Sequence, residues 1–348
     1  MKVLITGGGG FIGSHLIDSQ LAQGHWVRTV DLSLERLAHT INHPNLEAVR
    51  GDITDVNLIR RLVAGIDVVY HLASAHLDVN LSADYYRQVN VQATMNLLAA
   101  AQAAGVQRMV HCSSNGVIGE VKKPPANEAT PCQPTNIYEQ TKWIGEQAVL
   151  QFAQKTRFPV VVVRPAWVYG PRCPRTRKLF RTIEKGRFVM FGSGNTLRHP
   201  IYISDAVRGL ELCTKTDNIT GQIYLLAGER PVTIASLVQM IAEVQGVRPP
   251  LIRLPITVGK AAGNILQIAF KPLGRQPPFS RRSLDFFIKN NAYDISKAKQ
   301  DLGFVPQVDL RSGLIKTFDW LNSQKEGKSK MAQWKGSPQI IEIKEDQR

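Results

Sequence analysis

The sequence has few cysteines and no long apolar run. Its four cysteines are scattered at Cys112, Cys132, Cys173 and Cys213. This spacing suits neither a metal site nor a disulfide framework, so we expect no metal and a reducing cytoplasm. Uninterrupted apolar segments stay below the ~18 residues typical of a membrane-spanning helix. We expect no signal peptide, because the first predicted strand begins at Lys2.

Charged residues are also scarce, at 20% of 348 residues, while 43% are hydrophobic. This composition supports a sizeable core in one large or two smaller domains. The formal net charge is +15. A basic balance can serve nucleic acid, a membrane surface or acidic substrates. No nucleic-acid motif accompanies the basic clusters at 172–187 and 271–282, so we expect no nucleic-acid partner and favour phosphorylated ligands or an anionic membrane face.

The segment Met1–Asp31 has the pattern of a strand, a glycine turn, a helix and a second strand. The first strand is the apolar run Val3–Ile5, the helix has apolar residues at helical spacing from Ile12 to Leu21, and the second strand is Trp26–Val30. Such an order within about thirty residues predicts a βαβ unit.

The turn of this unit predicts a dinucleotide site. Gly7, Gly10 and Gly13 are spaced G-x-x-G-x-x-G. They allow a tight turn, close approach of a pyrophosphate and packing of helix on strand, respectively. Free N–H groups at the start of the helix then face the phosphate. Asp31 ends the second strand, where a carboxylate binds the ribose hydroxyls and repels a 2′-phosphate, so we predict NAD rather than NADP.

Strands and helices go on alternating to residue 169, which predicts an α/β fold with a doubly wound parallel sheet of the Rossmann type. Further predicted strands are Leu46–Val49, Val68–Ala73, Met109–Ser114 and Val160–Val163, and predicted helices begin near Val56, span Ala83–Ala104 and run from Tyr138 to Gln154. A looser pattern follows, with strands at 201–205 and 222–226 and helices at 206–214, 234–244, 294–302 and 310–322.

This change of pattern predicts two domains and a tail. We expect residues 1–169 to bind the dinucleotide, with 200–227 returning to that domain. Residues 170–199 and 228–322 would form a smaller α+β substrate domain. Residues 323–348 are polar, and we expect a flexible tail.

Two polar residues outside the glycine turn also attract attention. Asp52 follows the third predicted strand, where its carboxylate could accept a hydrogen bond from an adenine amino group or cap the helix near Val56. Asn90 interrupts the inward face of the helix Ala83–Ala104. A buried amide needs hydrogen-bond partners, so we expect Asn90 to fix a neighbouring loop.

A catalytic constellation is predicted at the ends of later strands. Ser114 ends the fifth strand, at the edge where parallel sheets bind ligands. Tyr138 and Lys142 lie four residues apart on a predicted helix and so share a face. A nearby ammonium and the positive nicotinamide lower the pKa of a phenol, which is otherwise near 10. Tyr138 could then take the proton of a substrate hydroxyl while Ser114 holds the oxygen.

With these residues in place, the chain resembles the extended short-chain dehydrogenase/reductase family, also known as the NAD-dependent epimerase/dehydratase group, over about Met1–Leu321. The motifs are TGGGGFIGSHL at Thr6–Leu16, GDI at Gly51–Ile53, HLAS at His71–Ser74, VNVQAT at Val89–Thr94, HCSSNGVIG at His111–Gly119, YEQTK at Tyr138–Lys142, RPAWVYGPR at Arg164–Arg172, RHPIYISD at Arg198–Asp205 and DISKAKQDLGF at Asp294–Phe304.

The resemblance implies an enzyme that uses NAD, with Ser114, Tyr138 and Lys142 as its catalytic residues. It implies a homodimer built from the helices near 83–104 and 138–154. It also implies a cofactor site lined by Gly7, Gly10, Phe11, Ile12, Gly13, Asp31, Asp52, Ile53, Leu72, Ala73, Ser74, Asn90, Tyr138, Lys142 and Pro165.

The substrate class is left open between two readings. Dehydratases of this family carry an Asp-Glu pair after the catalytic hydroxyl, and related decarboxylases a Glu two places after it. Asn115 and Gly116 stand there instead. Neither reaction is therefore favoured, which leaves oxidation, reduction or epimerisation through a ketone. Arg198, with help from Arg282, could clamp the diphosphate of a nucleotide-linked sugar.

Other residues favour a lipophilic alcohol such as a hydroxysteroid. Trp167 stands where sugar epimerases usually have an Asn, and the segment Pro255–Phe270 is apolar. We predict an NAD-dependent oxidoreductase or epimerase of a nucleotide-linked sugar, with the lipophilic alcohol as the alternative. A non-catalytic NAD-binding scaffold is the least favoured.

The segment Ile256–Phe270 has two interpretations of its own. It could be an interfacial helix that contacts a membrane, since basic residues follow it. It could also be a helix of the substrate domain packed on its own core. The second is favoured, because the segment is short and contains two glycines.

Overall fold

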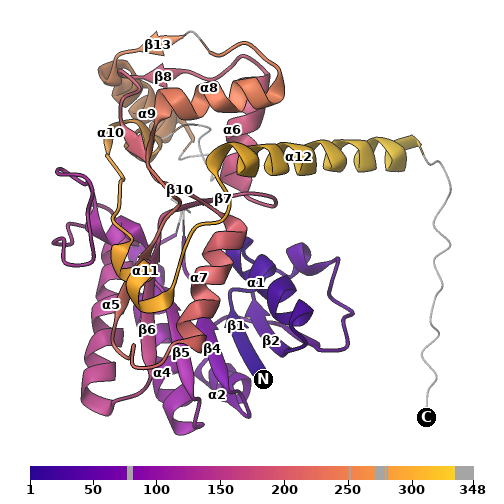
Figure 1. Ribbon diagram of the computed structural model, residues 1–348, viewed down its shortest axis with the longest axis vertical. Helices are drawn as coiled ribbons and strands as arrows, with labels where there is room; N and C mark the ends of the chain where they lie inside the picture. The colour runs from indigo at the N-terminus through magenta and orange to yellow at the C-terminus, as the bar shows by residue number, and fades with distance from the viewer. Residues whose placement is uncertain (77–80, 251, 271–278, 280, 334–348) are drawn as a thin grey trace.

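The computed structural model describes residues 1–76, 81–250, 252–270, 279 and 281–333, with the backbone alone at 281, 282 and 326–333. A parallel sheet with helices on both faces forms the larger part, and a smaller lobe lies above the carboxyl ends of its strands (Figure 1). None of the described helices is long and apolar enough to cross a membrane.

The main sheet has seven strands in the order β11-β6-β5-β4-β1-β2-β3, and every pairing is parallel. This order confirms the predicted Rossmann-type fold. From β1 the strands are added outward through β2 to β3, and the chain then crosses to the other side of β1 to add β4, β5 and β6. The switch point of the strand order lies between β1 and β4, where sheets of this kind bind ligands. The strands are β1 (Lys2–Thr6), β2 (Trp26–Asp31), β3 (Leu46–Arg50), β4 (Val68–His71), β5 (Arg108–Cys112), β6 (Val160–Pro165) and β11 (Ile223–Leu226).

Both faces of the sheet are buried, because successive side chains of a strand point to opposite sides. In β1, Val3 and Ile5 join the cluster under one pair of helices, and Leu4 joins the cluster on the other side. All three side chains are fully buried, and burying each of them stabilises the fold by about 1.5–3 kcal/mol. The first face is covered by α1 (Phe11–Ala22) and α7 (Ile203–Lys215), the second by α2 (Val56–Val63), α4 (Ala93–Ala103) and α5 (Ile137–Thr156).

The helix predicted at 83–104 has the expected extent but not a uniform winding. It consists of α3 (Ala83–Arg87), a π-helical turn η2 (Gln88–Gln92) and α4. Ser82 caps its start. The π turn contains Asn90, which is 1% exposed. A π turn adds one residue to the helix without adding a turn, and such turns are common at functional sites.

The smaller lobe is made of short elements around aromatic side chains. In the lobe, β9 (Leu197–Arg198) pairs with β12 (Val232–Thr233), and β8 (Met190–Phe191) with β13 (Arg253–Leu254); outside it and outside the main sheet, β7 (Trp167–Tyr169) pairs with β10 (Pro200–Tyr202). The helical elements of the lobe are α6 (Pro174–Glu184), α8 (Ile234–Gln245), α9 (Ile256–Phe270), η5 (Arg281–Leu284) and α10 (Asp285–Ile288).

The C-terminal part differs from its prediction. After α11 (Ser296–Leu302), α12 spans Leu310–Gln333 and projects away from the body (Figure 1). The part of the expected flexible tail up to Gln333 is therefore helical, and residues 334–348 lie outside the described residues. Helix-forming Lys, Glu, Met and Ala continue the helix past the last buried position, Leu321.

Two shorter helical turns complete the order of elements. They are η1 (Glu35–Leu37) after β2 and η3 (Asn115–Ile118) after β5. The second follows directly on the candidate catalytic hydroxyl, so the local backbone of the site is a tight turn rather than an extended strand end.

Candidate active site

The glycine turn between β1 and α1 leaves no room for side chains. Gly7 has a φ of +76°, and a Cβ there would lie 2.6 Å from the backbone nitrogen of Ala73. A Cβ on Gly13 would lie 2.2 Å from the Gly7 carbonyl oxygen, and one on Gly10 would lie 2.9 Å from the same atom. The N-cap of α1 is Gly10, with no side-chain cap, so N–H groups at the helix start are open to a ligand. Phe11 and Ile12 are the first residues of α1 and are half-buried.

Asp31 lies beside this turn, at the carboxyl end of β2. Its carboxylate accepts a hydrogen bond from the Ser33 backbone N–H at 3.2 Å. Burial raises the pKa of Asp31, and the backbone N–H groups around it oppose the rise. The Arg36 guanidinium donates to the Gly9 carbonyl at 3.0 Å and adds a positive charge close to the carboxylate.

Asp52 and Ile53 follow β3 at the same edge. The helix cap that was an alternative for Asp52 is supplied by Asp55, whose carboxylate accepts from the N–H groups of Asn57 and Leu58. That alternative is therefore wrong. Asp52 instead accepts from the Thr54 N–H in a local turn. Its predicted contact with adenine stays a prediction.

Asn90 fixes the loop after β4, where Leu72, Ala73 and Ser74 lie. Its side-chain oxygen accepts from the Ser74 hydroxyl and the Ala75 N–H, each at 2.9 Å. Its amide nitrogen donates to the Ala75 carbonyl and to the Thr141 hydroxyl of α5. All of its hydrogen-bonding capacity is used, so the expectation that a buried Asn90 holds a neighbouring loop is confirmed.

Lys142 is buried beneath the end of β5. It is 2% exposed, and its Nζ donates to the Cys112 carbonyl at 2.7 Å. Burial lowers the pKa of Lys142, while the charge of Glu146 one turn further along α5 opposes this. The ammonium is thus aimed at the strand ends rather than at solvent.

Ser114 and Tyr138 both precede this lysine in the sequence, Tyr138 by four residues. Ser114 caps η3, and its Oγ accepts from the Gly116 N–H at 3.1 Å. Tyr138 is in the first turn of α5, half-buried, with its ring edge-on to His76 at a centroid distance of 4.4 Å. The three predicted catalytic residues thus come from the end of β5 and one face of α5.

A buried ion pair supports the floor of the site. Arg164 on β6 contacts the Glu146 carboxylate with two nitrogens, Nε at 2.9 Å and NH2 at 2.5 Å. The same carboxylate accepts from the Ser113 hydroxyl at 2.7 Å. Both charged partners are at most 2% exposed. The bidentate geometry fixes β5, β6 and α5 relative to one another.

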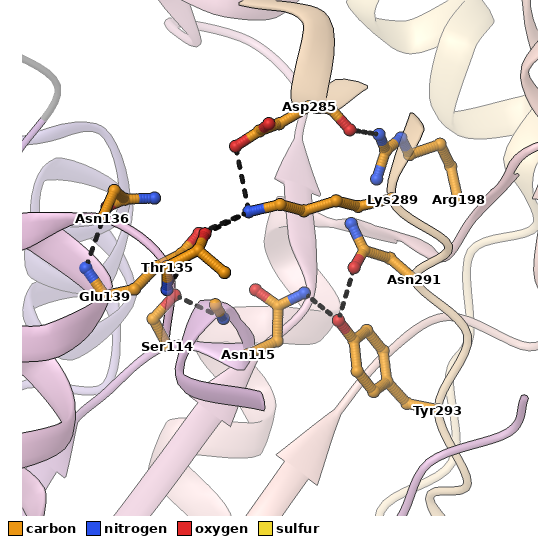
Figure 2. A network of polar contacts seen from close by, with 11 residues as sticks. Ser114, Asn115, Thr135, Asn136, Glu139, Arg198, Asp285, Lys289, Asn291 and Tyr293 are labelled. Carbon is orange, nitrogen blue, oxygen red and sulfur yellow. Dashed lines mark hydrogen bonds and ion pairs between the residues drawn. The ribbon is translucent and has the colours of Figure 1, made fainter. Parts of the chain in front are cut away.

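A second polar network connects the site with the smaller lobe (Figure 2). Lys289 donates to the Thr135 hydroxyl at 2.6 Å and pairs with Asp285 at 3.0 Å and Glu139 at 3.5 Å. Asn115 donates to the Tyr293 phenol at 2.6 Å. Segment 285–293 is therefore tied to the start of α5 and to η3.

Gly116 lies where η3 packs closely against Glu139 of α5. A Cβ there would lie 3.2 Å both from the Glu139 Cγ and from the Ser114 Oγ. A longer side chain at this position would have to displace Glu139.

The residues predicted to contact substrate have different surroundings. Arg198 is 4% exposed, and its guanidinium donates to the backbone carbonyls of Asp285 and Phe286. Burial lowers its pKa to about 10. This placement favours a structural role, and its contact with a diphosphate stays a prediction. The side chain of Arg282 lies outside the described residues.

Trp167 lies in an aromatic group that includes Phe286 of the smaller lobe. Its ring centroid is 6.1 Å from those of both Tyr169 and Phe286. It is half-buried, as is Pro165 at the end of β6. These rings offer apolar rather than charged contacts to their surroundings.

Glu139, Lys289 and Tyr293 are among the residues of the Figure 2 network that were not predicted. Asn136 with Glu139 is a capping-box spacing at the start of α5, a pattern that could have pointed to Glu139. No local pattern marks Lys289 or Tyr293, which meet the site only through the fold.

The residues present fit a dinucleotide. The cradle of Gly7, Gly10 and Gly13 would be filled by any Cβ, an open helix start faces it, and a carboxylate ends β2. The first two features match a pyrophosphate and the third a ribose diol.

Comparisons with known proteins agree with this geometry. A model of the NAD dependent epimerase/dehydratase family matches residues 3–227. A 3 beta-hydroxysteroid dehydrogenase/Delta 5-->4-isomerase of Mycobacterium tuberculosis is 31% identical, with 92% of this chain and 90% of that protein covered. An N-acetyl-alpha-D-glucosaminyl-diphospho-ditrans,octacis-undecaprenol 4-epimerase of Escherichia coli O157:H7 is 27% identical, with 93% and 97% covered.

Among solved structures, the UDP-glucuronic acid 4-epimerase of Bacillus cereus in complex with NAD superimposes with a TM-score of 0.77 at 26% identity, covering 93% of this chain and 99% of that one. The predicted resemblance and the predicted cofactor NAD are thereby confirmed. The chain belongs to the NAD-dependent epimerase/dehydratase family, and it is an NAD-dependent enzyme of the extended short-chain dehydrogenase/reductase type.

Proposed function

We propose that this protein oxidises a secondary hydroxyl, or reduces the matching ketone, on a nucleotide-linked sugar, as a dehydrogenase or as an epimerase that retains NAD. The observation that carries the reaction type is the buried Lys142 ammonium at the end of β5, on the same helix face as Tyr138 and hydrogen-bonded to the carbonyl of Cys112, two residues before Ser114. The sugar is supported by the two relatives whose names specify 4-epimerisation of sugars.

In this mechanism NAD, when bound by the glycine turn and Asp31, supplies the hydride acceptor. Tyr138 takes the hydroxyl proton as its phenolate, and the positive charge of Lys142 stabilises that phenolate. The Ser114 hydroxyl donates a hydrogen bond to the substrate oxygen. Lys142 is held in place by the Cys112 carbonyl, and the Glu146 carboxylate below it favours its charged form.

The substrate has a second candidate, a lipophilic alcohol. Trp167 and Phe286 form an aromatic wall, and the Arg198 guanidinium is engaged by backbone carbonyls. The hydroxysteroid dehydrogenase among the relatives supports this candidate. Mass spectrometry of small molecules that copurify with the protein, followed by turnover assays with sugar nucleotides and sterols, separates the two.

The test of the catalytic assignment is Tyr138→Phe. Loss of the acid–base group lowers kcat by about 10²- to 10⁴-fold, with NAD affinity retained. Tyr224→Phe is the matched control, because that phenol contacts Asp301 at the outer strand of the sheet. A Tyr138→Phe enzyme that turns over substrate at the parent rate contradicts the assignment.

We further propose the division of the chain into a cofactor domain, residues 1–169 with 200–227, and a substrate domain, residues 170–199 with 228–322. The pairing of β11 with β6 supports the return of the chain to the first domain. The free thiols of all four cysteines support a cytoplasmic location.

We also infer a homodimer formed through α4 and α5. On α5, Trp143 is 37% exposed and Ile144 is 44% exposed, which leaves apolar side chains for a partner. Analytical ultracentrifugation tests this. Trp143→Glu is expected to give a monomer, and a parent protein that sediments as a monomer at all concentrations contradicts the inference.

A further inference from the structure

The helix α9 in the smaller lobe turns three of its large apolar side chains outward, while Ile256, Leu266 and Phe270 are half-buried. Val258, Ile265 and Ile268 are 44%, 66% and 74% exposed. The favoured expectation was a helix of the substrate domain packed on its own core; α9 does pack against the lobe at Gly259, but these three side chains lie on its outer face. The two buried residues of the helix are Gly259 and Gly263.

The glycines explain how the helix comes to be oriented this way. A Cβ on Gly259 would lie 2.7 Å from the Leu284 side chain and 2.8 Å from the Phe191 ring. The helix therefore packs against the lobe through its smallest residues. Val258, Ile265 and Ile268 are therefore available to contact an apolar surface outside the lobe.

The spacing of the exposed residues makes one continuous face. Residues 258, 261, 265 and 268 are three, four and three positions apart, so they lie in one row along the helix. Thr257, Lys260 and Asn264 fall beside this row and are exposed too. The segment that leads into α9 adds Ile252 and Leu254, 52% and 36% exposed.

The stretch of sequence that contains α9 carries charge of one sign. Between Glu243 and Asp285 the sequence has seven arginine or lysine residues and no acidic residue. Arg253 and Lys260 are exposed beside the apolar row. A second copy of the chain placed symmetrically on this face would bring like charges together, whereas an anionic lipid surface would meet the opposite charge.

The length of α9 excludes a spanning arrangement. Its 15 residues measure about 22 Å, less than the ~30 Å of a bilayer core. An amphipathic helix with basic flanks instead lies in the interface, with its apolar side at the boundary of headgroups and acyl chains.

We propose that α9 is a membrane-docking helix, which lies flat on an anionic bilayer with Val258, Ile265 and Ile268 inserted and the basic residues facing the lipid phosphates. This docking does not depend on the identity of the substrate, and it is measured without turnover.

The experiment is sedimentation of the full-length protein with vesicles of phosphatidylcholine and phosphatidylglycerol at 7:3, and with phosphatidylcholine alone. We expect binding to the anionic vesicles to be at least tenfold tighter and to weaken in 0.5 M salt. Ile265→Glu with Ile268→Glu is expected to lower this affinity at least tenfold. The matched control is Val305→Glu with Ile315→Glu, two apolar residues that are 56% and 41% exposed elsewhere.

A second measurement does not rely on a disruptive change. Ile268→Trp should show fluorescence quenching by brominated lipids beyond that of the parent tryptophans. Docking is refuted by equal vesicle binding of the glutamate variant and the parent, by absence of quenching, or by a glutamate variant that loses self-association in lipid-free solution, since the face would then join two copies.

Discussion

Two histidines in the middle of the sheet predict a steep loss of stability in acid. His71 on β4 and His111 on β5 are paired across the strands, 1% and 0% exposed, with ring centroids 5.4 Å apart. The His71 ring contacts the hydroxyls of Thr6 and Thr94. Neither nitrogen of His111 has a hydrogen-bond partner among the described residues.

Burial, with a smaller effect of the Lys142 charge, lowers the pKa of His71 to about 3 and that of His111 well below its ordinary value. The unfolded chain binds a proton at each ring near pH 6.5, and the folded chain does not. The free energy of unfolding is therefore not reduced by these rings above pH 6.5, and it falls as the pH drops below that value. At pH 5 each ring costs about 2 kcal/mol of folding free energy.

The perturbation that isolates one ring is His111→Leu. At pH 8 the variant should gain about 1–3 kcal/mol, because an unpaired buried polar group is removed. At pH 5 it should gain about 2 kcal/mol more, because one proton no longer drives unfolding. Such amounts are a large share of the 5–15 kcal/mol typical of native proteins.

Urea unfolding at pH 8, 6.5 and 5, followed by tryptophan fluorescence, measures both contributions. His39→Gln is the control, since that ring is 48% exposed and pairs with Asp18 at the surface. If His111→Leu shows the same advantage at pH 5 as at pH 8, the folded protein does not exclude the proton and the reasoning is refuted.

Three further predictions concern the cofactor site and its support. Gly13→Ala should weaken NAD binding at least about tenfold in calorimetry, because its Cβ would overlap the turn; unchanged affinity would contradict the cradle. Asp31→Ala should raise the kcat/KM ratio of NADP over NAD at least about tenfold, because the carboxylate is lost and Arg36 remains; an unchanged ratio would exclude Asp31 from the ribose site. Arg164→Met should cost about 3–5 kcal/mol in urea unfolding by leaving Glu146 charged and unpaired, and adding Glu146→Leu should recover most of it; equal stability of both variants would contradict this.

Local sequence patterns were sufficient to predict the parallel sheet, the glycine turn, and the shared helix face of Tyr138 and Lys142. The glycines are required because the backbones of neighbouring residues approach them too closely for a Cβ atom. Tyr138 and Lys142 share a helix face because they are four residues apart. Asn90 was recognisable because a polar residue interrupted an apolar row. Each of these constraints acts within one or two elements, so the sequence carries it directly.

Other features depend on contacts between distant segments. Lys289 meets Thr135 across 154 positions. Arg198 has its guanidinium surrounded by carbonyls of the segment at 285, which no nearby residue foretells. The outward face of α9 could not be predicted either, since an apolar row looks the same in sequence whether it faces a core or solvent.

The π turn at Asn90 gives its helix one residue more than a regular α-helix of the same number of turns. Removing one residue from 88–92 would let an unbroken α-helical ladder form while α3 and α4 keep their relative orientation, and the irregular backbone that carries Asn90 would be lost. The carboxamide would then swing off the 74–75 backbone, and the amide of that loop would have to find water instead. A chain shortened in this way is therefore expected to lose the hydrogen bonds by which Asn90 holds the loop after β4.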